Sequence, residues 1–171
     1  MISYKFNPSI LREYDVRGVY GESLTAEDAQ MLGITFGTRV VESGGETVVV
    51  GFDGRITSPD LCNSLVKGLV GCGLKIYNVG MGPTPMLSFA IKHLNADAGV
   101  MVTGSHNPPE YNGFKMSLNG VPFYNQYAGP NNQPLTNEVN SFDHYNGHPQ
   151  AQGEYHYHFE PIFLTQGGRD S

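Results

Sequence analysis

One serine in this sequence is surrounded by side chains that could support phosphoryl transfer. Ser105 follows a short apolar run and lies in a segment whose prolines and glycines rule out a continuous helix or strand. An imidazole, two amides and an ammonium group follow closely, from His106, Asn107, Asn112 and Lys115. A serine hydroxyl is a poor nucleophile unless a base or a charge-stabilising group lies near it. A turn serine beside a surface histidine is the alternative, and residue types and spacing alone leave both interpretations open.

Composition and missing motifs exclude several other classes of function. The formal net charge is −6, with 10 Lys and Arg against 16 Asp and Glu, so we expect no nucleic-acid partner. No apolar run approaches membrane-spanning length and the N-terminus shows no signal pattern, so we expect no membrane partner. The two cysteines, Cys62 and Cys72, belong to one predicted helix and the residues just after it, so we expect no disulfide scaffold. A chain without disulfides is typical of the reducing cytoplasm, where we expect this protein to be located. Gly-x-Ser-x-Gly and Walker motifs are missing, which argues against an esterase or a P-loop enzyme.

Helical and strand patterns alternate through the first 120 residues. Thr25–Asp28 resembles a capping box, and Ser58 followed by Pro59 indicates an N-cap with proline in the first helical position. The predicted elements are helices that begin near Ala26, Ser58 and Thr84 and strands at Thr47–Phe52, Leu74–Val79, Ala98–Val102 and Gly113–Leu118.

This alternation predicts an α/β fold, a three-layer αβα domain with a mainly parallel mixed sheet. The segment 113–118 is expected to add an antiparallel strand at an edge. Ligands of such sheets bind beyond the carboxyl ends of the strands. Ser105 and the Asp53–Arg55 turn both come directly after a predicted strand, so we expect the site at this edge.

The pattern ends after residue 123, where the sequence becomes rich in Asn, Gln, Pro, Gly and Tyr. We therefore predict two parts, an α/β domain at 1–123 and a weakly structured or β-poor tail at 124–171, in which only Tyr155–Leu164 is strand-like. In a strand, His156 and His158 would share one face and could bind Zn²⁺ or Cu²⁺. Exposed histidines without a metal are the alternative.

The serine segment closely resembles the active-site loop of the α-D-phosphohexomutases, the phosphomannomutase/phosphoglucomutase family. Thr103–Pro108 and Tyr111–Lys115 carry this resemblance. Leu11–Gly18, Val50–Arg55 and Val79–Pro85 resemble three further segments of the family, in the same order. The resemblance covers residues 5 to about 123, the first of the four domains in these enzymes.

The resemblance implies a role for each candidate residue. Ser105 would be a phosphoserine that exchanges its phosphoryl group with hexose phosphates and supplies one oxygen ligand to Mg²⁺. His106 and Lys115 would assist proton transfer and charge neutralisation. The remaining implied site residues are Arg17 as a catalytic residue, and Tyr14, Asn107, Asn112 and Arg55 for substrate or phosphate binding. Phe52 departs from the family, which usually has arginine there.

The Asp-rich loop that holds the metal in the family has no counterpart here, and neither do the family's sugar-recognition and phosphate-clamping loops. We therefore expect Mg²⁺ to need ligands from outside this sequence, a glucose 1,6-bisphosphate-type activator to be required, and mutase activity to be incomplete in this chain alone.

Residues from about 121 to 171 resemble part of the YHYH-domain proteins, through Asn140–Asp143, Gly147–Pro149 and Tyr155–His158. This suggests a join between a mutase first domain and a YHYH fragment, whether natural, engineered or an artefact. A non-enzymatic metal-binding or purely structural chimeric protein is the alternative function.

Overall fold

A computed structural model of the chain describes residues 4–12, 15–119, 121–122, 147–149 and 155–157. The chain divides into two compact units, Met1–Phe123 and Tyr124–Ser171. The second unit contains a two-stranded antiparallel pair, β7 with β8. The origin of this unit as a YHYH-like fragment, and the tail predicted there, stay predictions, because most of its residues lie outside the described ranges. The elements in chain order are η1 (Pro8–Ile10, one 3₁₀ turn), β1 (Val16–Val19), α1 (Ala26–Glu42), β2 (Thr47–Phe52), α2 (Ser58–Gly71), β3 (Lys75–Met81), α3 (Thr84–His93), β4 (Ala98–Val102), β5 (Tyr111–Leu118), β6 (Val121–Pro122), β7 (Gly147–Pro149) and β8 (Tyr155–Tyr157).

The first unit is built on one mixed sheet with the strand order β1-β5-β4-β2-β3, and β6 pairs with β5. β2 runs parallel to both β3 and β4, whereas β5 pairs antiparallel with β4, β1 and β6. The α/β class with a mixed sheet is confirmed, with parallel pairing confined to β3, β2 and β4. The edge position predicted for residues 113–118 was wrong, because β1 pairs along the far side of β5. β1 was not predicted, since four residues carry too little periodicity to identify a strand.

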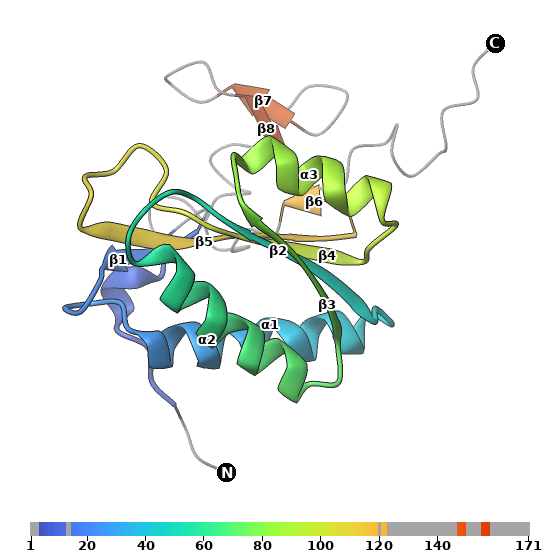
Figure 1. Ribbon diagram of the computed structural model, residues 1–171, viewed down its shortest axis with the longest axis horizontal. Coiled ribbons are helices and arrows are strands. Elements are labelled where there is room, and N and C mark those ends of the chain that lie inside the picture. The colour runs from blue at the N-terminus through green and yellow to red at the C-terminus, as the bar shows by residue number, and fades with distance from the viewer. Residues whose placement is uncertain (1–3, 13–14, 120, 123–146, 150–154, 158–171) are drawn as a thin grey trace. The chain divides into compact units, whose positions relative to one another are not determined.

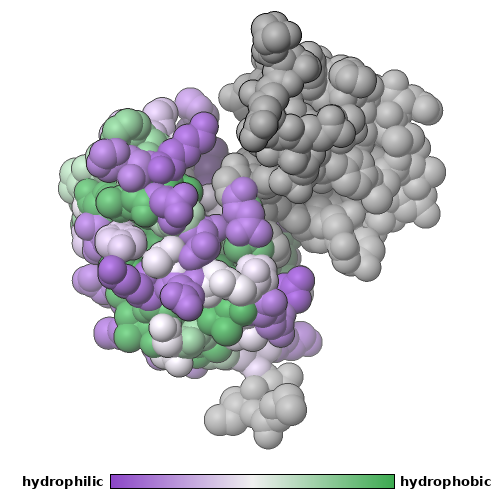
Figure 2. Space-filling model, turned by 90° about the vertical axis from the view of Figure 1, so that its right-hand side faces the viewer, coloured by the Kyte–Doolittle hydropathy of each residue, from purple (hydrophilic) through white to green (hydrophobic). Residues whose placement is uncertain are grey.

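Helices cover both faces of this sheet (Figure 1). α1 and α2 lie on one face, where the larger hydrophobic core includes Phe36, Leu65, Val50 and Phe114. α3 lies on the other face, where a smaller cluster contains Val49, Leu87, Ala90, Ile91 and Met101. On the face of the molecule seen in Figure 2, hydrophobic side chains form separate patches between hydrophilic ones. The two cores explain why β2 and β4 consist almost entirely of apolar residues, because both of their faces are buried.

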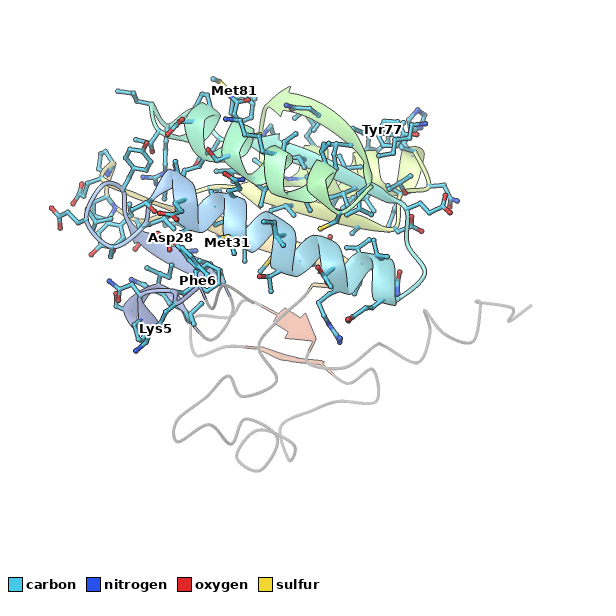
Figure 3. All side chains as sticks on the ribbon, turned by 90° about the horizontal axis from the view of Figure 1, so that it is seen from below. Lys5, Phe6, Asp28, Met31, Tyr77 and Met81 are labelled. Atoms are coloured by element: carbon cyan, nitrogen blue, oxygen red, sulfur yellow. The ribbon has the colours of Figure 1, made fainter. Side chains whose placement is uncertain are left out.

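The predicted capping box at the start of α1 is confirmed. The Thr25 hydroxyl accepts a hydrogen bond from the Asp28 N–H, and the Asp28 carboxylate accepts one from the Thr25 N–H. The Tyr4 hydroxyl also donates to Asp28. Burial, followed by this hydrogen bond, raises the pKa of Tyr4 to about 12. Figure 3 labels Asp28 at the start of α1 and Phe6 in the N-terminal segment, and Phe6 packs against the larger core.

The start of α2 differs from the prediction by one residue. Thr57, not Ser58, is the N-cap, and it makes no side-chain cap hydrogen bond. Ser58 is the first helical residue and is fully buried. Its hydroxyl instead donates to the Asp53 carboxylate at 2.6 Å, which ties the helix to the end of β2. None of the helices in the described part of the chain is long and apolar enough to cross a membrane.

Candidate active site

Two loops and one helix start meet at the edge of the sheet where β2 and β4 end. The loop from β4 to β5 (yellow, at the left of Figure 1) carries Ser105, and the loop from β2 to α2 carries Asp53 and Arg55. The Asp53 N–H donates to the Val102 carbonyl at 2.9 Å, so the two loops leave neighbouring strands side by side. The expected position of the site at this edge therefore agrees with the positions of these residues.

Ser105 is half-buried and has a left-handed backbone, with φ at 54°. This conformation costs a residue with a side chain roughly 1–2 kcal/mol, so surrounding contacts must hold it. The Ser105 N–H donates to the Thr103 hydroxyl at 2.9 Å. The Asn107 backbone and side-chain N–H groups both donate to the Gly104 carbonyl at 3.1 Å. His106, between Ser105 and Asn107, is exposed.

Asp53 is the acceptor that fixes both loops. Its Oδ2 accepts hydrogen bonds from the Thr103 hydroxyl and the Gly104 N–H, at 2.8 and 3.1 Å. Its Oδ1 accepts from the Ser58 hydroxyl and the Arg55 N–H. Burial alone would raise the pKa of this carboxyl, but these hydrogen bonds outweigh burial and hold the pKa below its ordinary value.

Arg55 crosses from the β2 loop to the serine loop. Its Nε donates to the Asp53 carboxylate at 3.2 Å. Its two terminal nitrogens donate to four backbone carbonyl oxygens of the serine loop, those of Ser105, Asn107, Pro108 and Tyr111, at 2.6–3.0 Å. All five N–H donors of the guanidinium are therefore used within the protein. The predicted phosphate contact is not tested by this geometry, but it would require some of these bonds to break.

Asn112 lies in the interior of the protein. Its side chain is 0% exposed, and its amide nitrogen donates to the hydroxyls of Thr57 and Ser58 at 2.9 Å. The substrate-binding role of Asn112 stays a prediction, and in this structure its amide is used inside the protein. The residue joins β5 to the start of α2, on the same face of the sheet as Phe114.

Lys115 and Arg17 lie on the opposite face of the same two strands. Lys115 is the cross-strand partner of Met101, which belongs to the core cluster beneath α3. Arg17 is the partner of Gly113, two positions from Lys115, so both cations occupy the α3 face near the serine loop. Lys115 is exposed, whereas the Arg17 side chain is 14% exposed and pairs with Asp15. Within the described residues, the Arg17 Nε is buried without a hydrogen-bond partner.

Among the residues that the structure describes, the remaining predicted positions are not part of this cluster of loop contacts. Tyr14 and His158 lie outside the described residues. His156 is in β8, where His148 is its cross-strand partner. Phe52 packs against the larger core. In the described part of the chain, no group of three or more His, Cys, Asp or Glu residues could hold a metal ion.

Sequence reasoning gave Thr103 and Ser58 no role in the site, since it treated Ser58 only as a helix N-cap and Asp53 only as part of a turn. A usable signal was present, since Asp53 and Thr103 are the first polar residues after two adjacent apolar strands. The hydroxyls of Thr103 and Ser58 lie 2.8 and 2.6 Å from the Asp53 carboxylate oxygens. Neither contact follows from local sequence, because each depends on how the elements pack.

The sequence of the chain is similar to a known protein family and to individual members of it. Residues 8–129 match the family model of phosphoglucomutase/phosphomannomutase, alpha/beta/alpha domain I. A phosphomannomutase/phosphoglucomutase of Pseudomonas aeruginosa is 48% identical over 118 residues, which cover 69% of this chain and 26% of that protein. A phosphoglucomutase of Neisseria gonorrhoeae is 44% identical over 111 residues, covering 65% of this chain and 24% of that protein.

A solved structure is also similar. The crystal structure of a phosphoglucomutase/phosphomannomutase family protein from Burkholderia thailandensis matches with a TM-score of 0.66 and 35% identity. That match covers 95% of this chain and 35% of the Burkholderia chain. The chain spans about a quarter of the length of the two curated relatives.

Proposed function

Since the chain belongs to the phosphoglucomutase/phosphomannomutase family, whose domain I it matches, we propose that Ser105 accepts and donates the phosphoryl group in the interconversion of hexose 1- and 6-phosphates. The observation that carries the proposal is the placement of Ser105. It lies half-buried beyond the end of β4, in a loop fixed by Asp53 and Arg55.

The transfer proceeds in two balanced steps. The Ser105 oxygen attacks one phosphorus of a hexose 1,6-bisphosphate, the new O–P bond forms, and the P–O bond to the sugar breaks. The serine proton ends on the released sugar oxygen. In the second step, the free 1- or 6-hydroxyl of a hexose monophosphate attacks the phosphorus of the phosphoserine and forms a new O–P bond. The P–O bond to Ser105 breaks, and the hydroxyl proton goes to the Ser105 oxygen. A bisphosphate is therefore both the intermediate and the activator that first loads the serine.

The cations on β1 and β5 support this proposal. Phosphoryl transfer depends mainly on positioning and on stabilising the charge of the phosphoryl oxygens. Lys115 and Arg17 share one face of the sheet beside the serine loop. The Nε of Arg17, which has no hydrogen-bond partner among the described residues, could donate to a phosphoryl oxygen. His106, exposed next to Ser105, would exchange the proton with solvent. Asn107 would shape the loop through its bonds to Gly104.

The described residues do not fit a complete Mg²⁺ site. A hard divalent cation needs about six oxygen ligands. Asp53 is the carboxylate that anchors this loop, and both of its oxygens already accept hydrogen bonds. A phosphorylated Ser105 would add one ligand, so the further ligands must come from outside the described residues.

The test is incubation of the chain with glucose 1,6-bisphosphate, followed by intact-mass analysis. We expect the mass of one phosphoryl group to be added to the wild type and not to Ser105→Ala. Peptide mapping should place the group on Ser105. An unlabelled wild type, or equal labelling of both proteins, would refute the proposal. Mutase activity itself would be followed separately with glucose 1-phosphate as substrate.

Two further expectations belong to this proposal. A cytoplasmic location fits a hexose-phosphate enzyme whose Cys62 and Cys72 are both free thiols. Metal binding by His156 and His158 stays a prediction from the sequence. A Zn²⁺ titration of the chain, compared with a variant that ends after Tyr124, would test it.

A further inference from the structure

We propose that Arg55 is the positioning residue for Ser105, and that its guanidinium is the centre around which the serine loop takes its reactive conformation. The catalytic consequence rests on the proposed function. The conformational part of the proposal is independent of it and can be measured without any reaction.

The contacts of Arg55 form a cage that fits a guanidinium. Four backbone carbonyl oxygens of the serine loop accept from its terminal nitrogens, and the Asp53 carboxylate accepts from Nε. The side chain is 15% exposed, so solvent reaches it little. Carbonyl oxygens that converge in this way repel one another unless a cation lies between them. The loop therefore depends on the guanidinium for both charge and hydrogen-bond donors.

The guanidinium also lies against the backbone just before the nucleophile. A Cβ atom at Gly104 would lie 2.3 Å from the Arg55 Cζ and 2.4 Å from its Nε. No side chain fits between them, so the glycine before Ser105 is required by Arg55. Arg55 can occupy this position only because residue 104 is a glycine.

The left-handed backbone of Ser105 is the conformation that this cage holds. The Ser105 carbonyl accepts from the Arg55 Nη2 at 3.0 Å, and the Asn107 carbonyl accepts from the same nitrogen at 2.8 Å. One nitrogen therefore fixes the carbonyls on both sides of His106. Without it, Ser105 can relax to the more favourable negative-φ region and its hydroxyl changes direction.

Lysine cannot replace Arg55 in this role. A guanidinium presents five donors in a planar fork, whereas an ammonium presents three from a single atom. The five acceptors here surround three different nitrogens. Arg55→Lys keeps the charge and loses the geometry, so it separates a positioning role from simple charge neutralisation.

The experiment uses the full chain and three variants, Arg55→Ala, Arg55→Lys and Arg39→Ala. Arg39 is the matched control, an exposed arginine of α1 paired with Glu42. Hydrogen exchange followed by mass spectrometry measures protection in the peptide that covers residues 103–112 and in peptides from α1 and β3. The same proteins are then labelled with glucose 1,6-bisphosphate, with and without methylguanidinium at a concentration below denaturing levels, and with ammonium as the ionic control.

We expect both Arg55 variants to lose protection in residues 103–112 only, and Arg39→Ala to match the wild type. Ser105 labelling should be roughly 10²-fold slower in both Arg55 variants, the effect of a misplaced reacting group. Methylguanidinium should restore protection and labelling in Arg55→Ala, because it can occupy the cage, and ammonium should not.

Unchanged protection of the loop in Arg55→Ala would overturn the inference. So would a loss of protection throughout the first unit, since Arg55 would then stabilise the whole fold and not the loop. If the wild type is never labelled but the loop responds as expected, the proposed function fails and the positioning role stands. If the wild type is labelled and the loop does not respond, the positioning role fails alone.

Discussion

Neutralising Asp53 tests most directly whether one carboxylate holds the two loops of the site together. We predict that Asp53→Asn destabilises the chain by roughly 2–4 kcal/mol. Asp53 accepts five hydrogen bonds, two on Oδ1 and three on Oδ2. An asparagine keeps one acceptor oxygen, so at least two donors would face an NH₂ group. Each buried donor left unpaired costs about 1–3 kcal/mol, and the Ser58 hydroxyl can relieve part of this by rotating.

The assay is urea unfolding followed by far-UV circular dichroism, because the sequence contains no tryptophan. The midpoint should fall while the slope stays constant, which would show that stability and not compactness has changed. Glu42→Gln removes the same charge from an exposed pair with Arg39 and should cost at most about 0.5–1 kcal/mol. An effect of Asp53→Asn no larger than that of Glu42→Gln would refute the reasoning.

Asp53→Asn should also change how the folding stability depends on pH. The folded pKa of Asp53 is lowered, so its contribution to stability is fully present above the ordinary aspartate pKa of about 4. That contribution is lost as the pH falls through the lower folded value. The wild type should therefore lose stability on acidification more steeply than Asp53→Asn. Asp97, whose pKa is also lowered, is unchanged in both proteins and does not affect the comparison. If the stability of the two proteins fell equally with decreasing pH, Asp53 would not be the source of this pH dependence.

Two further predictions concern the helical layer. Gly68→Ala should destabilise the chain by roughly 1–3 kcal/mol in urea unfolding, because the new Cβ would lie 2.2 Å from the Gln30 carbonyl oxygen in α1. Gly71→Ala, which has nothing within 4 Å of the new Cβ, should be neutral or stabilising by up to about 1 kcal/mol, and equal effects of the two would contradict the close helix contact. With a thiol reagent at neutral pH, Cys72 should react before Cys62, whose burial raises its pKa to about 11; equal rates in the folded chain would contradict this.

The elements that the sequence predicts well are those whose pattern is long or carries a local signal. β2 and β4 have the predicted bounds, because uninterrupted apolar runs identify strands buried on both faces. α1 begins at its capping box, since Thr25 and Asp28 satisfy each other within one turn. β1 was missed because its partner is distant in sequence and its four residues include Arg17 and a glycine.

The candidate residues divide by face of the sheet, which spacing alone could not show. Asn112 and Lys115 are three positions apart in one strand, so they lie on opposite faces. Asn112 is consequently buried under α2, whereas Lys115 is exposed on the face that α3 covers in part. Residue type suggested one polar cluster, but strand geometry separates it into a structural residue and an accessible one.

The conformation of Ser105 is a property of the assembled sheet. The bonds that hold its loop, from Arg55 and to Asp53, join residues 50 to 56 positions apart. They can form only after β2 and β4 have paired, because that pairing brings the two loops together. A short peptide with the same serine motif would have no means of holding a left-handed serine. The motif therefore identifies Ser105 as the proposed nucleophile, while Arg55 in the turn after β2 makes the hydrogen bonds that hold the loop around it.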